Sequence, residues 1–549
     1  MNSTKETIKE DKIKEESNNQ TGNLSEKDHE ENLSEKEHEE LTRKRYMEIS
    51  DKKRTQIFIN VNISCIAGIM LQTALTTALP PIMKDFNISV NTGQWLTSGF
   101  SLAMSIMIPL TSFLITRFRT RRLFLTAIGL FLTGLTIALL SVNFYMMLVG
   151  RVIQACGSGL LSSMAQVIIL TIYPPERRGS AMGWYGLSVG AAPVIAPTIG
   201  GVLADTVGWR MIFVVSIVIM VITLIYTLFI FTDCLPNKKV KFDAFSFILS
   251  ALTFGGVTLA IGNYGTYKFV SYQVLMVLII GLIASVLFIY RQLHSKSPFL
   301  DIRVLKHKCF TIAVLTTIAI QLILMGSAVI LPLYFQQVKG YSATISGLAV
   351  LPGSLSLAFI SPFAGKIYDK MGIKILLLIS GVFSTLSNLS LYFITIKINI
   401  WVVAVINIIR CVSLGIITMP IITWGMSKIP ASKTTDGSAT INSFRIVSGA
   451  IGTVLFVTVM TTVENFVKNS KKEPQLYGIN FVFLCMAGIS LIILLFGIFG
   501  CESKFSFKNK TNKEKKGKDI KSSMEEINEN KKDSTDEFEV VIDNNKINN

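Results

Sequence analysis

Charged residues are scarce in this chain of 549 residues: they make up 16% of it, whereas hydrophobic residues make up 50%. An ordinary soluble domain carries roughly a quarter charged residues, so this composition excludes a simple soluble enzyme. Acidic residues are scarcest in the middle of the chain, where only ten of the 36 lie between residues 55 and 500. The net charge of +17 therefore belongs to the apolar middle, and the two tails are nearly neutral.

Histidine is absent from the apolar runs, because the four histidines stand at positions 29, 38, 294 and 307. This excludes a histidine proton relay through a membrane. The seven cysteines form no Cys-x-x-Cys pair, and the chain has no phosphate-binding loop, no dinucleotide-binding fingerprint and no His-Glu-x-x-His sequence. We therefore expect no enzyme activity, no metal site, no bound cofactor and no direct use of a nucleotide.

Fourteen apolar runs fill the middle of the chain, and a helix needs about 20 apolar residues to cross a bilayer. The runs span residues 56–79, 95–115, 122–142, 145–172, 180–203, 209–231, 244–264, 270–290, 309–335, 345–365, 373–396, 400–427, 438–462 and 478–500. Backbone polar groups find no water in lipid, so such runs must form helices. We predict an all-α membrane protein with the lipid bilayer as its surroundings.

The short loops between the runs alternate in charge. Loops on the side of the two tails carry 19 Lys and Arg residues, and loops on the opposite side carry eight. Cytoplasmic loops are enriched in Lys and Arg, so we expect the tail side, called the basic side below, to face the cytoplasm. This predicts a multi-pass protein of the plasma or inner membrane with both termini cytoplasmic. Basic residues spread over short loops argue against nucleic acid as a partner.

Two charged tails, residues 1–54 and 501–549, flank the spans. The first contains a nine-residue duplication, residues 23–31 followed by 32–40, with one histidine in each copy. Highly charged segments with few apolar residues cannot bury a core. We therefore expect both tails to be disordered in the cytoplasm, in preference to a metal site at the two histidines.

Within the spans the basic residues are three arginines, at positions 151, 410 and 445. An ionisable group at that depth is costly, so each is a candidate functional residue. The ten acidic residues between positions 55 and 500 all map to loops or helix ends. A proton-coupling site normally needs a group that titrates in the working pH range, and no mid-membrane carboxylate offers one.

A polar stripe follows Arg151 along the fourth span. At 100° per residue, four polar residues lie within about 60° of its direction: Gln154, Ser158, Ser162 and Gln166. We interpret the stripe as the lining of a water-filled or substrate-filled cavity, although such residues also bond neighbouring helices in membrane bundles. On the first span, Gln72 and Thr76 share one face and leave the same two interpretations open.

The fifth span carries a stripe of glycine and proline. Within a band of about 80° lie Gly183, Gly186, Gly190, Pro193, Pro197 and Gly201. Small residues let another helix approach closely, and prolines remove backbone hydrogen bonds and permit bending. The residues alone fit a packing face and a bending surface equally well.

Four segments match motifs that occur together in one transporter family. They are Leu110–Arg122 after the second span, Gly365–Lys374 after the tenth, Gly150–Gly159 in the fourth and Gly190–Gly201 in the fifth. Through them residues 55–500 resemble the major facilitator superfamily, in its fourteen-span branch of drug:proton antiporters of the EmrB and QacA type. The fifth-span segment resembles the glycine-proline motif of antiporters and adds Gly200 to the stripe.

The resemblance implies a major facilitator fold of two six-helix bundles, residues 55–231 and 309–500. Two extra transmembrane helices would lie between them in residues 232–308, which makes 14 spans. It also implies that the loops after spans two and ten gate the basic side. The implied gating residues are Arg117, Arg121, Arg122, Gly365, Asp369, Lys370 and Gly372.

This chain departs from the family pattern in two places. In the first copy of the gating motif, Ser112, Thr116 and Arg119 replace the usual Gly, Asp and Gly, so an ion pair of that Asp cannot form there. Asp369 in the second copy is the better carrier of that role. Gln72 stands where many branch members have an acidic residue, which favours neutral, amphiphilic or zwitterionic substrates over cationic drugs.

From the resemblance we expect a secondary active transporter that exports drugs or amphiphilic small molecules by proton antiport and alternating access. The proton gradient would supply the energy, with Arg151 as coupling residue and Asp205, Asp369 or the substrate itself as further candidates to carry the proton. The expected substrate cavity is lined by Gln72, Thr76, Gln154, Ser158 and Gln166. The alternatives are a nutrient or metabolite importer or facilitator on the same fold and, behind it, a transport-inactive membrane sensor.

Overall fold

The computed structural model describes residues 49–500 except 236, 238, 239, 241, 265–270, 296, 297 and 471. Residues 1–48 and 501–549, which make up nearly all of the two charged tails, lie outside the described residues. The nine-residue duplication lies outside them too, so the expectations for the tails stay predictions.

Fourteen helices in the described ranges are long and apolar enough to cross a membrane, which confirms the predicted number. These ranges contain helices and connecting turns and no strand, so the predicted all-α fold is confirmed. The first six spans, called the N-terminal half below, are α2 (Asp51–Phe86), α3 (Val90–Arg117), α4 (Thr120–Leu139), α5 (Phe144–Ile172), α6 (Arg178–Thr206) and α7 (Arg210–Ile230).

The remaining spans form an extra pair and a second group of six. The extra pair consists of α8 (Ala244–Ser250), the π-helix η2 (Ala251–Gly255) and α9 (Gly256–Tyr264), which make one span, and α10 (Tyr272–His294). The second six, called the C-terminal half, are α11 (Lys308–Leu333), continued by the π-helix η4 (Tyr334–Val338), α12 (Ala343–Met371), α13 (Ile373–Tyr392), α14 (Ile400–Met426), α15 (Thr434–Val467) and α16 (Pro474–Phe499).

Several helices start at polar side chains that satisfy a free backbone N–H group. The side chains of Ser89, Asn143, Ser342 and Asn399 accept hydrogen bonds from the first turns of α3, α5, α12 and α14. Such caps stabilise a helix by about 1 kcal/mol each. They explain why the spans begin close to the predicted positions.

Two spans differ from their predicted form. The first was predicted to end at residue 79, yet α2 continues through two prolines to Phe86 and stops at Asn87, whose φ is 50°. Membrane helices tolerate proline because neighbouring groups satisfy the freed backbone. The seventh, predicted as one helix over residues 244–264, is interrupted by η2, where a Cβ at Gly255 would lie 2.9 Å from Ile106 of α3. The π-helix thus lies where the span contacts α3.

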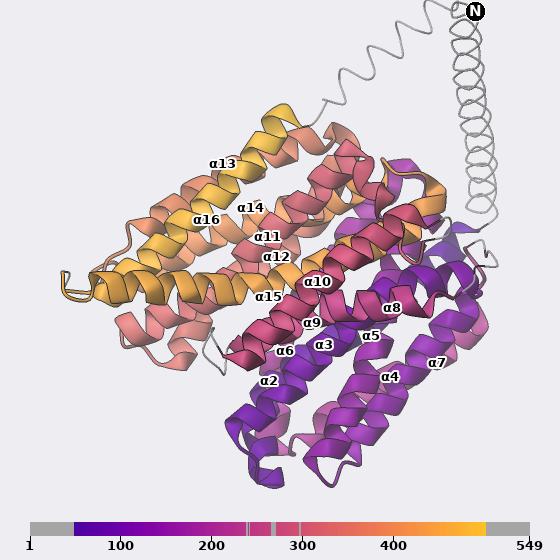
Figure 1. Cartoon of the computed structure of the whole chain (residues 1–549), viewed down its shortest axis with the longest axis horizontal. Coiled ribbons are helices and arrows are strands. Elements are labelled where there is room, and N and C mark those ends of the chain that lie inside the picture. The colour runs from indigo at the N-terminus through magenta and orange to yellow at the C-terminus, as the bar shows by residue number, and fades with distance from the viewer. Residues whose placement is uncertain are drawn as a thin grey trace, which may run out of the picture. The chain divides into compact units, whose positions relative to one another are not determined.

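Each half is packed around helices that approach through glycine. In the N-terminal half, Gly134 of α4 lies against the backbone of Gly150 on α5, and Gly157 lies against Phe131. In the C-terminal half, Gly381 of α13 lies against Leu494 of α16. Figure 1 shows the result, with α4 and α7 at one side and α13 and α16 at the other. The predicted division at residues 231 and 309 is compatible with this arrangement and stays a prediction.

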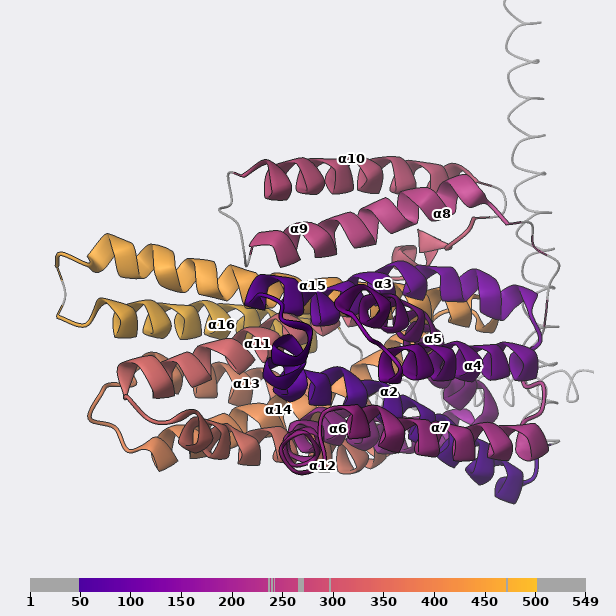
Figure 2. The same cartoon turned by 90° about the horizontal axis from the view of Figure 1, so that it is seen from below.

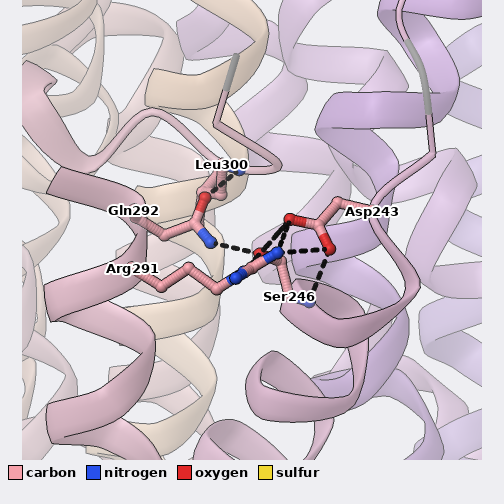
Figure 3. A network of polar contacts seen from close by, with 5 residues as sticks. All are labelled: Asp243, Ser246, Arg291, Gln292 and Leu300. Carbon is pink, nitrogen blue, oxygen red and sulfur yellow. Dashed lines mark hydrogen bonds and ion pairs between the residues drawn. The ribbon is translucent and has the colours of Figure 1, made fainter. Parts of the chain in front are cut away.

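The extra pair lies beside α3 and α15 (Figure 2). An apolar cluster joins it to both helices, with Phe113 from α3, Phe288 from α10, Phe299 from the following segment and Ala439 from α15. A polar network lies at the basic ends of α8 and α10 (Figure 3), where Arg291 forms an ion pair of 3.0 Å with Asp243. The two extra spans therefore contact both halves.

We expect Gly134→Ala to destabilise the N-terminal half. A Cβ there would lie 2.5 Å from the backbone nitrogen of Gln154 and 2.5 Å from the oxygen of Gly150. Overpacking of this kind costs about 1–3 kcal/mol, so the thermal unfolding midpoint of detergent-solubilised protein should fall. Gly129→Ala on the same helix brings the same gain in helix propensity, and its Cβ would meet no heavy atom within 4 Å, so the midpoint should not fall. Equal midpoints for the two variants would contradict this packing.

Candidate functional site

Arg151 is fully buried inside the N-terminal half. Its Nη1 donates a hydrogen bond of 2.6 Å to Gln154 Oε1, and its Nε donates one of 3.2 Å to the backbone oxygen of Leu96 on α3. The guanidinium carbon lies 4.3 Å from the ring centroid of Phe100, also on α3. These partners are neutral, so dipoles and an aromatic face hold the arginine, and no carboxylate among the described residues pairs with it.

The polar stripe that begins at Arg151 ends in a bridge between the two halves. Asn442 Nδ2 of α15 donates to Gln166 Oε1 at 3.0 Å, and Gln166 Nε2 donates to Asn442 Oδ1 at 3.2 Å. Ser438 of α15 donates to the same Gln166 oxygen at 3.2 Å. All three side chains are buried, so this end of the stripe is closed in this structure.

Between these ends the stripe is occupied by two serines. Ser162 donates to the backbone oxygen of Ser158 at 2.9 Å, and the Ser158 hydroxyl lies 3.0 Å from the position of a Cβ at Gly68 on α2. Both serines are buried. Of the predicted cavity residues on α5, Ser158 therefore packs against α2 and Gln166 bonds α15, and their role in lining a substrate cavity stays a prediction.

A related pair of side chains occurs on α14. Counting from the capping residues Asn143 and Asn399, the positions of Arg151 and Gln154 correspond to Asn407 and Arg410. Arg410 is 2% exposed, and its Nη2 donates to Asn407 Oδ1 at 2.6 Å. Its Nε and Nη1 have no hydrogen-bond partner among the described residues. Each half thus buries one arginine that bonds an amide side chain three residues away. The arginine precedes the amide on α5 and follows it on α14.

Asp369, from the second copy of the gating motif, caps a helix of the other half. Its carboxylate accepts hydrogen bonds from the backbone N–H of Gly179 at 2.9 Å and of Ser180 at 2.7 Å, at the start of α6. The free N–H groups and the dipole of a helix N-terminus favour a negative charge there. Gly179 and Gly365 lie in direct backbone contact beside it. The basic end of α12 is thereby fixed to α6.

The glycine-proline stripe of α6 divides between two partners. Gly183, Gly186 and Gly190 pack against α12, where Ser361 and Ala358 lie within contact distance of an added Cβ. Further along, α6 packs against α2 of its own half. A Cβ added at Gly200 would lie 2.8 Å from the Cβ of Ala74 on α2. In this part of α6 the backbone oxygen of Pro197 accepts a hydrogen bond from the Thr77 hydroxyl, and Pro193 is half-buried. A Cβ added at Gly201 would meet no heavy atom within 4 Å. The motif is a packing face toward both α12 and α2.

The basic residues of the first gating copy bond within the N-terminal half and the segment that follows it. Arg117 Nη1 donates to the backbone oxygen of Val240 at 2.7 Å, and Arg121 Nη2 donates to that of Leu228 at 2.6 Å. Arg122 and, in the second copy, Lys370 are exposed. Gly372 adopts φ 81° at the end of α12, a conformation that favours glycine.

Three predicted site residues lie toward the side opposite the basic side. Gln72 is half-buried and Thr76 is exposed on α2, where Thr76 donates to the backbone oxygen of Thr73 at 2.6 Å. Asp205 is exposed near the end of α6. In the contacts of the described residues, Arg151 bonds Leu96 and Gln154 and none of these three, so the predicted site residues form several separate groups.

Residues on α15 complete these groups and were not predicted from the sequence. Asn442 and Ser438 bond Gln166, and Asp436 accepts a hydrogen bond from the Ser112 hydroxyl of α3. Asp436 occupies the position in the C-terminal half that Ser180 occupies in the N-terminal half, counted from the 3-10 turns that precede α15 and α6. A comparison of the two halves would have shown an acid there in place of a serine. No local signal identifies Asn442.

Comparison with known proteins agrees with this architecture. A family model described as Major Facilitator Superfamily matches residues 61–453. The chain belongs to the major facilitator superfamily. A solved structure of the human organic anion transporter MFSD10 superposes with a TM-score of 0.59 at 13% identity, covering 81% of this chain and 99% of that one, and it supports the fold alone.

Curated relatives cover most of this chain. The uncharacterized transporter YcnB of Bacillus subtilis (strain 168) is 36% identical over 78% of this chain and 93% of its own length. The lincomycin resistance protein LmrB of Listeria innocua is 34% identical over 72% and 84%. The multidrug export protein EmrB of Haemophilus influenzae is 26% identical over 75% and 81%. The predicted resemblance to the fourteen-span exporters is confirmed, and the chain is a multi-pass membrane transporter.

The hydrogen bonds described above that join the two halves of this transporter lie toward its basic side. They involve Gln166 and Asn442, Asp369 and the start of α6, and Ser112 and Asp436. In Figure 1 the other ends of α2 and α15 lie apart. This superfamily member is therefore held closed on its basic side.

We expect Gly179→Ala to weaken closure of the basic side. The added methyl group would collide with the Asp369 carboxylate and lie 2.8 Å from the backbone oxygen of Gly365. The initial rate of substrate transport in membrane vesicles should fall about tenfold, the effect of losing one charge-assisted contact. Gly201→Ala on the same helix meets no atom within 4 Å and should transport at the wild-type rate. If both variants lost the same fraction of the transport rate, the need for glycine in α6 would come from helix flexibility and not from the contact with α12.

Proposed function

We propose that this transporter exports drug-like amphiphilic molecules from the cytoplasm by proton antiport through alternating access. The observation that carries the proposal is the contact between the halves: a few polar contacts close it at the basic side, and α6 packs against α12 through glycines. Contacts of this kind form and break at a small cost in free energy. We expect this glycine face to let α6 move against α12. Relatives named for multidrug export and lincomycin resistance support drugs as the cargo.

The orientation in the proposal rests on the charge of the loops. An even number of spans places both termini on one side, and the positive-inside rule assigns the basic side to the cytoplasm. The closed basic side then makes this an outward-facing conformation. The cell membrane is the proposed location.

The proton gradient is the proposed energy source. It supplies about 1.4 kcal/mol per pH unit and about 2.3 kcal/mol per 100 mV for each charge moved. Arg151 is the proposed coupling residue, because a buried guanidinium without a carboxylate responds strongly to a charge that enters its surroundings. Asp369 and Asp205 remain candidates to carry the proton, and so does the substrate.

Neutral and zwitterionic amphiphiles are the proposed substrates. Gln72 is a neutral residue on α2, and the arginines within the spans supply only positive charge. A cationic drug would therefore meet no mid-membrane carboxylate. An importer on the same fold is the alternative, but the names of the relatives and the glycine-proline face of α6 favour export.

The test uses inside-out vesicles with an acidic lumen and a panel of labelled amphiphiles that includes a lincosamide and a quaternary dye. Accumulation that a protonophore abolishes supports proton-coupled export. Uptake in right-side-out vesicles that are acidic outside, with no accumulation in the inside-out vesicles, would instead support import.

We expect Arg151→Gln to abolish gradient-driven accumulation, because it removes the buried charge and keeps a side chain able to bond Gln154. The control is Arg210→Ala, which removes an exposed ion pair of 3.4 Å with Asp85; such pairs contribute about 0–1 kcal/mol. Transport by Arg151→Gln at the wild-type rate would refute the coupling role.

A further inference from the structure

The two halves meet along two seams of similar construction. At one seam the end of α12 meets the start of α6, which follows the 3-10 turn η1 (Pro175–Arg177). At the other the end of α3 meets the start of α15, which follows the 3-10 turn η5 (Ala431–Lys433). Counted from these turns, Gly179 and Ser180 correspond to Thr435 and Asp436. The two seams can therefore be compared position by position.

A carboxylate lies at each seam, but the two carboxylates lie on different helices of the repeated arrangement. At the first it is Asp369 on α12, which accepts hydrogen bonds from the N–H groups of residues 179 and 180. At the second the matching position on α3 is Thr116, whose hydroxyl lies 3.4 Å from that of Thr435. The carboxylate is supplied by Asp436 of α15, which accepts a hydrogen bond from Ser112 of α3. Asp436 on α15 thus supplies the carboxylate that the first copy of the gating motif lacks on α3.

The segment after the extra pair also contacts Asp436. The backbone N–H of Asp301 donates to Asp436 Oδ1 at 3.3 Å, and the Asp301 carboxylate pairs with Lys433 of η5 at 3.6 Å. One residue earlier, the N–H of Leu300 donates to Gln292 Oε1 of α10 at 3.2 Å. Asp436 therefore joins α3, α15 and the segment that leads from the extra pair.

Figure 3 shows how this segment is anchored to the extra pair. Gln292 Nε2 donates to the Ser246 hydroxyl at 2.9 Å, and Ser246 donates to Asp243 at 2.7 Å. Arg291 donates three hydrogen bonds to the same carboxylate, one from Nε and two from Nη2. Partial burial would raise the pKa of Asp243, but the bonds from Ser246 and Arg291 outweigh it and hold the pKa below its usual range. The Asp243 carboxylate therefore stays ionised at neutral pH.

We propose that Asp436 is the positioning residue that closes the α3–α15 seam on the basic side, braced by residues 300 and 301 of the extra pair's connection. The proposal rests on the proposed transport function. Asp436 takes the place of the acid that Thr116 does not supply, and its position in the first turn of α15 favours a negative charge. The extra spans then take part in opening and closing, because their connection contacts the same carboxylate.

The test moves the acid from one side of the seam to the other. Asp436→Ser removes the carboxylate, and the triple variant Thr116→Asp, Thr435→Gly, Asp436→Ser rebuilds the arrangement of Asp369, Gly179 and Ser180. Glycine is included because a Cβ at position 179 would collide with Asp369. We expect the single variant to lower the maximal export rate about tenfold with little change in half-saturating concentration, and the triple variant to recover at least about half of the rate.

Two further variants keep the result interpretable. Asp436→Asn keeps the size of the side chain and removes its charge, and it should lose activity as the serine variant does. Asp85→Asn changes an exposed acid on the side opposite the basic side, which accepts hydrogen bonds from Trp209 and Arg210 within the N-terminal half, and it should transport at the wild-type rate. Wild-type transport by both Asp436 variants would overturn the proposal.

A distance measurement separates this proposal from the export function. Spin labels at positions 119 and 428, both exposed and on opposite sides of the seam, are placed in protein whose native cysteines are replaced by serine. We expect Asp436→Ser to shift the distance distribution to longer values and the triple variant to restore it. Identical distributions would refute the gate. The expected shifts in a protein that exports no compound of the panel would support the gate and refute the export function.

Discussion

Two helix N-termini on the basic side hold the halves of this transporter together. A helix N-terminus carries free N–H groups and a partial positive charge, so a carboxylate placed there is stabilised. Asp369 reaches the start of α6 from the opposite half, whereas Asp436 lies in the first turn of α15 and accepts a hydrogen bond from the opposite half. The close contacts of α6 with α12 and the bridge between Gln166 and Asn442 require these two seams to be closed.

The buried arginines set a second constraint. Arg151 and Arg410 each lie in the interior of one half, bonded to an amide and without a carboxylate partner in the described part of the chain. A charge in a low-dielectric interior is costly unless it is paired, so a negative or dipolar group that enters the region lowers the free energy of the protein. This is the physical basis for expecting the arginines, and no acid, to respond to substrate.

The extra pair of spans connects the halves as well as lengthening the chain. Its apolar cluster includes Phe113 of α3 and Ala439 of α15, which belong to different halves. Its polar network leads through Gln292 to residues 300 and 301 and on to Asp436. A rigid-body movement of α3 against α15 would therefore strain or break contacts with the extra spans, which couples all three groups of helices.

The sequence by itself determined the fourteen helices, the all-α fold and the family, because lipid forces each apolar run to satisfy its own backbone and the motifs are local. It also identified Arg151, Asp369 and the stripe of α6 as candidates, since each stands in a short recognisable segment. Only the tertiary structure placed Gln166 against Asn442 and Ser112 against Asp436, pairs separated by 276 and 324 residues. Such pairings depend on how helices pack across the seam, where shape complementarity and not local periodicity decides which side chains meet.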